Sequence, residues 1–324
     1  MAARRLGTRC SNATSRPTDA MLLRICHTTR FEYQMPAYQS HNEARMKPLE
    51  SAGQRCVEFE LEITPATSAF EYDDYYRNRV HTFSIHSPHP ALIVAARSLV
   101  ERLPTARPEA LPMAFSDFLL EDHARYQAEY DFLSPSRHVP FSDPMRKFFW
   151  LTRPDPAEDV AAYANRVVAF IRDQFGYEPG MTKVQSTADE ILTVGAGVCQ
   201  DFAHVTIGVL RLAGIPSRYV SGYLAPDSKR ATKNIGTQAS HAWVEAQLPG
   251  LGWTGFDPTN GCVVDERHIS VAVGRDYSDV SPLHGVYRSH GGKEVMSVEL
   301  QIAPQPDRPH QPDSTNNSNQ QNQQ

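Results

Sequence analysis

The chain lacks both a surplus of basic residues and any long hydrophobic run. Its 32 lysines and arginines are outnumbered by 37 aspartates and glutamates, so the formal net charge is −5. Because nucleic-acid-binding surfaces are rich in lysine and arginine, we expect no nucleic-acid partner. A helix needs about 18 consecutive apolar residues to cross a bilayer, and the sequence contains no such run. We therefore expect no membrane partner.

Cysteine is also scarce, and no two cysteines form a Cys-x-x-Cys pair. The five are scattered along the chain: Cys10, Cys26, Cys56, Cys199 and Cys262. Disulfide-stapled secreted domains have dense, even-numbered cysteines, so this pattern predicts a reducing, cytoplasmic setting. Zinc-ligand spacing is absent from the loose set that Cys262 forms with His241, His268, His284 and His290. No acidic loop has calcium-ligand spacing, and we predict no metal and no cofactor.

The most informative stretch is 195–204, Gly-Ala-Gly-Val-Cys-Gln-Asp-Phe-Ala-His. A turn with two glycines leads there into apolar residues at helical spacing: Phe202, Val205, Val209 and Leu212. The pattern places Cys199 at a helix N-terminus. Backbone N–H groups and the helix dipole favour an anion at that end and can lower the pKa of a thiol from about 8.5 to roughly 3.5–7.5. Cys199 is the candidate nucleophile, although an isolated helical cysteine is more often a core residue.

Two later segments supply a base and an acid. His241 begins a strand-like run, 241–248, and Asp257 ends a second one, 252–257. A nucleophile, a base and a group that orients the base are the minimum set for covalent acyl transfer. The combination predicts Cys199, His241 and Asp257 as catalytic residues.

Four motifs carry a family resemblance: GVCQDFAH at 197–204, IPSRYVSGY at 215–223, SHAWVE at 240–245 and GFDPTN at 255–260. Together they resemble the core of the bacterial transglutaminase-like proteins, which belong to a papain-like superfamily. The N-terminal part resembles the domain that accompanies this core, with Arg77-Asn78 where that family usually has Gly-Asn. The resemblance implies an α+β fold, with an N-terminal β domain followed by a catalytic domain of helices packed on an antiparallel sheet.

The chain divides by composition and periodicity. Apolar residues alternate with polar ones at 25–33 and 57–63, which predicts strands, and 21–100 as a β domain. We expect a connecting helical segment at 101–154, the catalytic domain at 155–303, and disorder at 1–20 and at 304–324. Within the catalytic domain we expect a helix capped by Asp155, a capping box at Thr187–Glu190, and closing strands at 262–273 and 293–302. The cationic loop with Lys229, Arg230 and Lys233 is expected to be solvated.

These features predict an enzyme that attacks an amide bond of a protein or peptide through a thioester, as a protease, amidase or cross-linking acyltransferase. The alternative is a non-catalytic protein-binding module on the same fold. The Cys199 N–H is the expected first donor to the oxyanion, with Tyr177 and Gln185 as weaker candidates for the second. Trp243 and Trp253 either shield the site or pack in the core. We expect Asp201 at the helix end outside the site, and His204 in the core.

Overall fold

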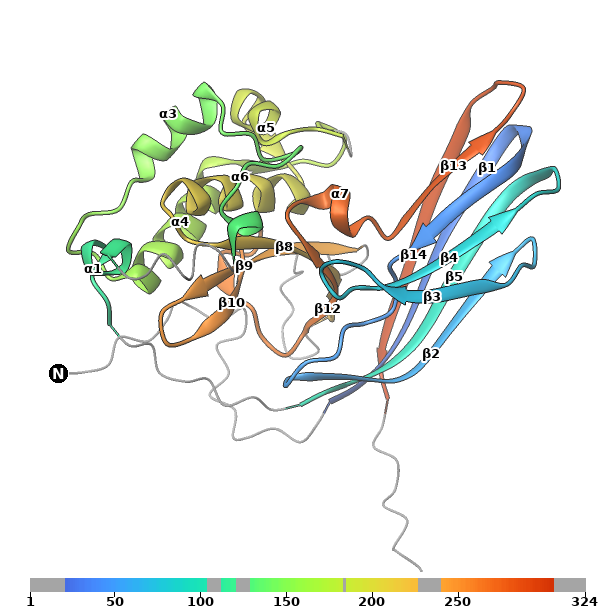
Figure 1. The fold of residues 1–324 in the computed structure, drawn as a ribbon, viewed down its shortest axis with the longest axis horizontal. Helices are drawn as coiled ribbons and strands as arrows, with labels where there is room; N and C mark the ends of the chain where they lie inside the picture. The colour runs from blue at the N-terminus through green and yellow to red at the C-terminus, as the bar shows by residue number, and fades with distance from the viewer. Residues whose placement is uncertain (1–20, 104–111, 121–128, 183–184, 227–239, 306–324) are drawn as a thin grey trace, which may run out of the picture.

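The structure is a computed structural model that describes residues 21–103, 112–120, 129–182, 185–226 and 240–305. The two terminal segments expected to be disordered lie outside these ranges, except for residues 304 and 305. The cationic loop with Lys229, Arg230 and Lys233 lies outside them too. In the described part, an antiparallel sheet stands beside a domain of helices and strands, as Figure 1 shows. The expected α+β class is confirmed.

The N-terminal sheet is organised around one long strand. Five strands come from the first hundred residues: β1 (Met21–Ala44), β2 (Gln54–Thr64), β3 (Ala69–Asp73), β4 (Arg79–Ile85) and β5 (His89–Arg102). They run in the order β2-β5-β1-β4-β3. Alternate residues of β1 from Leu23 to Thr29 are buried, as its period-two pattern predicts. Arg77, in the turn before β4, has a φ of 67°, a left-handed conformation that favours glycine.

The last two strands, β13 (Leu283–Arg288) and β14 (Glu294–Pro304), differ from expectation in their position. We expected residues 293–302 to close the catalytic domain. Instead, both strands pair antiparallel with β1, with Thr29 opposite Val298 in β14. Figure 1 shows β13 and β14, in orange and red, beside the blue β1. Alternation of apolar and polar residues predicts a strand and its solvent-exposed face, but it does not identify the neighbouring strand with which it pairs.

The domain that carries the candidate catalytic residues has helices on an antiparallel sheet. The sheet has the order β11-β10-β9-β8-β12. Its strands are β8 (Ser217–Leu224), β9 (His241–Leu248), β10 (Gly252–Asp257), β11 (Cys262–Val263) and β12 (His268–Gly274). The helices are α1 (Phe115–Leu120), α3 (Asp143–Thr152), α4 (Val160–Gln174), α5 (Ala188–Val194), α6 (Cys199–Leu212) and α7 (Tyr277–Val280). The short elements η1 (Tyr130–Phe132), β6 (Gly176–Tyr177) and β7 (Ala196–Gly197) complete the described part.

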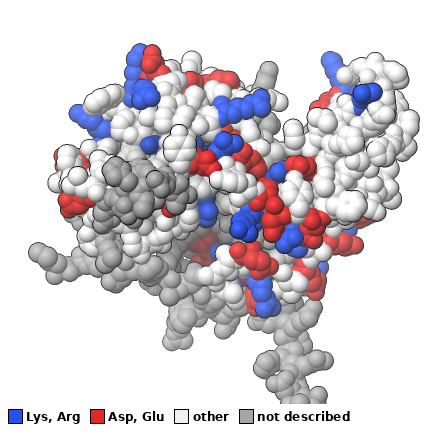
Figure 2. Space-filling model, in the orientation of Figure 1, with Lys and Arg blue, Asp and Glu red and all other residues white. Residues whose placement is uncertain are grey.

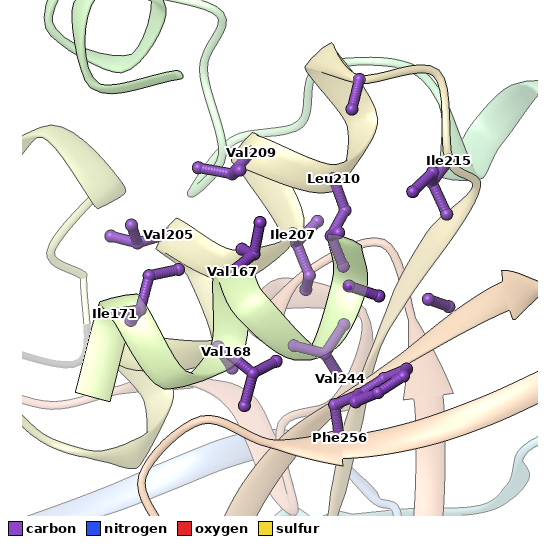
Figure 3. Close-up of a cluster of buried hydrophobic side chains, with 14 of the residues drawn as sticks. Val167, Val168, Ile171, Val205, Ile207, Val209, Leu210, Ile215, Val244 and Phe256 are labelled. Carbon is purple, nitrogen blue, oxygen red and sulfur yellow. The ribbon is translucent and has the colours of Figure 1, made fainter. Parts of the chain in front are cut away.

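The core of this domain lies between α4, α6 and the sheet. Figure 3 shows α6 side chains such as Val205 and Leu210 beside Val167 of α4, with Val244 of β9 and Phe256 of β10 below them. All five side chains are fully buried. This packing holds α6, and with it Cys199, against the strands that carry the other two candidate residues.

Two helix starts differ from expectation. The cap of α4 is Asp159, whose carboxylate accepts the Ala162 N–H at 2.8 Å, and not Asp155. Asp155 does accept the Ala157 N–H at 2.9 Å, but it closes a turn before the helix. At α5, Thr187 makes no side-chain capping bond. The partner of Glu190 is the Ser186 hydroxyl, which lies one residue earlier.

Side-chain amides of the N-terminal sheet region bind the backbone of β12. The amide of Asn78 accepts the Val273 N–H and donates to the Val273 carbonyl, both at 2.7 Å. Gln54 makes the equivalent pair with Ser270, at 3.0 and 2.8 Å. Each amide replaces a neighbouring strand for one residue of β12, so the two sheets are joined by directed hydrogen bonds. On the face shown in Figure 2, acidic and basic side chains are interspersed near this junction, and ion pairs such as Arg45–Asp74 join them at 3.1 Å.

Candidate active site

Cys199 is the first residue of α6, as the sequence predicts. The turn that leads to it needs its glycines. Gly195 has a φ of 78°, and a Cβ on Gly197 would lie 2.6 Å from a carboxylate oxygen of Asp201. That carboxylate is buried and accepts the Val198 N–H at 2.9 Å, so it fixes the entry to the helix. As expected, Asp201 serves the helix end.

The Cys199 thiol is free and partly buried. Cys26 and Cys56 are also free thiols, and burial raises the pKa of Cys56 to about 11. Cys262 is buried and disulfide-bonded. The odd number of cysteines therefore did not exclude a single bridge.

His241 begins β9 and is bonded to Asp257, which ends β10. Its Nε2 is 2.8 Å from Oδ2 of Asp257, and both side chains are fully buried. Its other ring nitrogen, Nδ1, is buried and forms no hydrogen bond with the described residues. Cys199 is near enough to His241 to contribute to the pKa of the imidazole. Burial lowers the pKa of His241, but Asp257 and Cys199 outweigh it and raise the pKa to about 10.

Asp257 ends β10 and accepts hydrogen bonds on both oxygens. Oδ1 takes the backbone N–H groups of Thr259 and Asn260, both at 3.0 Å. Oδ2 is bonded to the Asn260 side-chain amide at 2.7 Å, besides His241. Burial opposes the charged form, but His241 and then His268 hold the pKa of Asp257 well below its ordinary value. The carboxylate is therefore ionised and held in one orientation.

Two residues of this site, His268 and Asn260, are not among those predicted from the sequence. His268 Nε2 lies 3.2 Å from Oδ2 of Asp257. Asn260 completes the motif Asp-Pro-Thr-Asn, and its position three residues after the carboxylate is typical of a side chain that closes a turn. No local signal identifies His268, because it reaches Asp257 from β12, at the opposite edge of the sheet from β10 and β11.

The weaker candidates for the second oxyanion donor, Tyr177 and Gln185, have different surroundings, as does Trp243. Tyr177 pairs with Gly197 in the small sheet, and burial, with the nearby Cys199 and Asp257, raises its pKa to about 12. Gln185 is exposed. Trp243 is fully buried beside the site, with its ring centre 6.2 Å from that of His241.

Trp253 and His204 have other partners. Trp253 is partly buried, with the Arg218 guanidinium 4.2 Å from its ring centre. His204 is fully buried, as expected for a core residue, and accepts the Tyr277 N–H at 3.2 Å. Its ring stacks on that of His138, with ring centres 5.1 Å apart.

Three buried residues have the composition of a metal-ligand set. The nearest atoms of His241, Asp257 and His268 lie within 4.8 Å of one another. Hydrogen bonds at 2.8 and 3.2 Å already join both imidazoles to the carboxylate. His284 and His290 do not join this set, because His284 is part of β13 in the other sheet and the His290 ring packs at a tilt against Tyr38 of β1.

A thiol at the start of a helix, packed on an antiparallel sheet that carries a histidine and a carboxylate, defines a papain-like class of protein. Residues 23–101 match the bacterial transglutaminase-like N-terminal region, and residues 151–258 match the transglutaminase-like superfamily core. An uncharacterised protein of Mycobacterium leprae is 35% identical over 278 residues, which are 85% of this chain and 96% of that protein. The chain belongs to the bacterial transglutaminase-like family.

Two further comparisons extend this picture. A protein-glutamine gamma-glutamyltransferase of Pseudomonas aeruginosa is 33% identical over 107 residues, which are 32% of this chain and 16% of that protein. A Cytophaga hutchinsonii structure described as a candidate cysteine protease has a TM-score of 0.69 at 21% identity. The match covers 90% of this chain and 93% of the Cytophaga hutchinsonii chain, so it supports the α+β fold described above. Across the described helices, none is both long and apolar enough to span a membrane.

Proposed function

We propose that this protein is a cysteine-dependent acyl-transfer enzyme that acts on amide bonds of a protein or peptide through a thioester on Cys199. The observation that supports this most is the position of His241, bonded to Asp257 through Nε2 and left with Nδ1 for the Cys199 thiol. A base held in this way has one tautomer and one direction for proton transfer. The raised pKa of His241 favours the imidazolium, and hence a thiolate–imidazolium pair.

The proposed reaction has two steps. The Cys199 thiolate attacks the amide carbonyl carbon, and the carbonyl oxygen becomes an oxyanion. The Cys199 N–H, at the open end of α6, is the first donor to that oxyanion. The His241 imidazolium then gives its proton to the leaving nitrogen, the C–N bond breaks, and a thioester remains. Water or a primary amine releases the acyl group, and His241 takes up the proton of the attacking molecule.

The proposed enzyme catalyses hydrolysis if water accepts the acyl group, and cross-linking if a primary amine accepts it. The similarity to a protein-glutamine gamma-glutamyltransferase makes a glutamine side-chain amide a reasonable acyl donor. The similarity in fold to a candidate cysteine protease makes water an equally reasonable acceptor. Both reactions need the same Cys199, His241 and Asp257, and they differ in what reaches the thioester.

Iodoacetamide labelling at neutral pH tests the activated thiol, with peptide mass spectrometry to resolve each cysteine. We expect Cys199 to react much faster than Cys56, a free thiol of the same chain whose pKa burial raises. Cys199→Ala provides the background. Equally slow labelling of all the free thiols would contradict the proposal and favour a non-catalytic protein-binding module.

A second assay separates the two acyl-transfer reactions. The protein is incubated with a glutamine-containing protein and a fluorescent primary amine, and dye incorporation is compared with the release of ammonia and peptides. Incorporation that depends on Cys199 supports cross-linking. Release without incorporation supports hydrolysis. If neither occurs across a peptide library, acyl transfer on amide bonds is refuted for these substrates.

A further inference from the structure

The buried hydrogen-bond chain does not end at Asp257. His268 continues it, with Nε2 3.2 Å from Oδ2 of Asp257 and Nδ1 3.1 Å from Oδ1 of Asp265. Arg267 in turn donates from Nε and Nη2 to Oδ2 of Asp265, at 3.2 and 3.0 Å. The side chains of His268 and Asp257 are fully buried, and that of Asp265 is 1% exposed. Water is therefore excluded from this part of the chain of bonds.

We infer that His268 is a positioning residue, which holds Oδ2 of Asp257, the same oxygen that bonds His241, and so fixes the direction in which His241 faces the thiol. A carboxylate at the end of a strand keeps one direction only as firmly as the donors on its two oxygens hold it. In Asp257, backbone N–H groups hold Oδ1, and Oδ2 is held by His241, Asn260 and His268. Thr259 and Asn260 belong to the turn that follows Asp257, and His241 is the residue that Asp257 orients. His268 is the remaining donor, and it comes from a different strand.

His268 is itself held firmly enough for this role. The Trp243 ring lies edge-on to it, with ring centres 5.3 Å apart and planes at 79°. On the Nδ1 side, the Asp265 carboxylate is itself held by Arg267, so the ring has a fixed partner in the turn before β12. Immediately along β12, Gln54 binds the backbone of Ser270. Packing, a local turn and the N-terminal sheet region thus all hold the strand that carries this imidazole.

The inference rests on the proposed function for its catalytic meaning, so the test uses measurements that do not depend on turnover. Two substitutions are compared. His268→Gln keeps an N–H donor near the position of Nε2, and His268→Leu removes it at similar volume. The first measurement is the rate of Cys199 alkylation by iodoacetamide at pH 7. The second is the downfield proton NMR signal of the His241–Asp257 hydrogen bond.

We expect His268→Leu to slow alkylation by about 10- to 100-fold, the range found when partners that orient a metal-bound histidine are removed. The His241 proton signal should broaden or disappear. His268→Gln should stay within about threefold of the wild type and keep the signal. His27→Leu is the matched control, because His27 is equally buried and bonds the Tyr223 hydroxyl at 2.9 Å, so it is not part of the hydrogen-bond chain that includes Asp257. It should change neither measurement.

Unchanged alkylation and an unchanged signal in folded His268→Leu would overturn the inference, as would His268→Gln behaving like His268→Leu. If His268→Leu does not fold, Asp265→Asn replaces it. That variant keeps His268 but weakens its other anchor, and an unchanged signal and rate would again refute the role. A slow wild-type thiol together with a His241 signal that still depends on His268 would refute the proposed function and leave the positioning role intact.

Discussion

The amide of Asn78 offers a strong test of how the two sheets are joined. It is fully buried and makes two hydrogen bonds of 2.7 Å to the backbone of Val273 in β12, the edge strand of the sheet that carries His241. Asn78→Ala removes both partners and leaves a buried N–H and a buried carbonyl without a bond. Each such group costs about 1–3 kcal/mol, so we expect a loss of about 2–6 kcal/mol. Folded proteins are typically stable by about 5–15 kcal/mol, which makes this a large change.

Urea denaturation followed by circular dichroism and by tryptophan fluorescence measures the loss. The midpoint should fall sharply, while an unchanged slope would show that the unfolded state is unaffected. Asn165→Ala is the matched control. Asn165 lies on α4, only partly buried, and donates to the Ala161 carbonyl inside the helix. It should cost less than about 1 kcal/mol, because that carbonyl belongs to the helix ladder.

Asn78→Asp decides whether the reasoning holds. A carboxylate can still accept the Val273 N–H, but it places an oxygen against the Val273 carbonyl and beside Asp74, to which the Asn78 amide donates at 3.1 Å. We expect Asn78→Asp to be at least as destabilising as Asn78→Ala. A milder effect of aspartate, or a loss below 1 kcal/mol for alanine, would show that the amide does not hold the sheets together.

Three further predictions concern the site. Asp257→Asn should lower turnover on any confirmed substrate by on the order of 10⁴, because an amide does not stabilise the imidazolium, and a normal rate would exclude Asp257 from catalysis. Because the pKa of His241 is raised from 6.5 to about 10, its contribution to stability is complete below pH 6.5 and is lost as pH rises towards 10. His241→Gln should therefore flatten the fall in urea midpoint between pH 7 and 10, and equal pH slopes would refute the shift. Gly197→Ala puts a Cβ 2.6 Å from an Asp201 oxygen that bonds the Val198 N–H. It should cost about 0.5–2 kcal/mol in denaturation and slow Cys199 alkylation, whereas wild-type behaviour would mean that Asp201 is free to shift.

Much of the candidate site could be predicted from the sequence because its signals are local. A glycine turn followed by residues at helical spacing is enough to place Cys199 at the start of α6. Short alternating runs are enough to place His241 at the start of β9 and Asp257 at the end of β10. The helix caps were less predictable. Asp155 has the right neighbours for a cap, but the chain turns once more, and Asp159 takes that position.

Other features depend on contacts between distant parts of the chain. The alternation at 293–302 predicts a strand, but only folding decides that β14 pairs with β1 rather than with the catalytic sheet. His268 has no recognisable motif, and it meets Asp257 because the chain after β11 brings β12 back past the strand ends. Turns and periodicity act over a few residues, so local sequence is enough to predict which residues begin and end the elements of the site. The pairing of distant strands and the donors that hold the carboxylate could not be predicted in this way, because they depend on surfaces that exist only after the chain has packed.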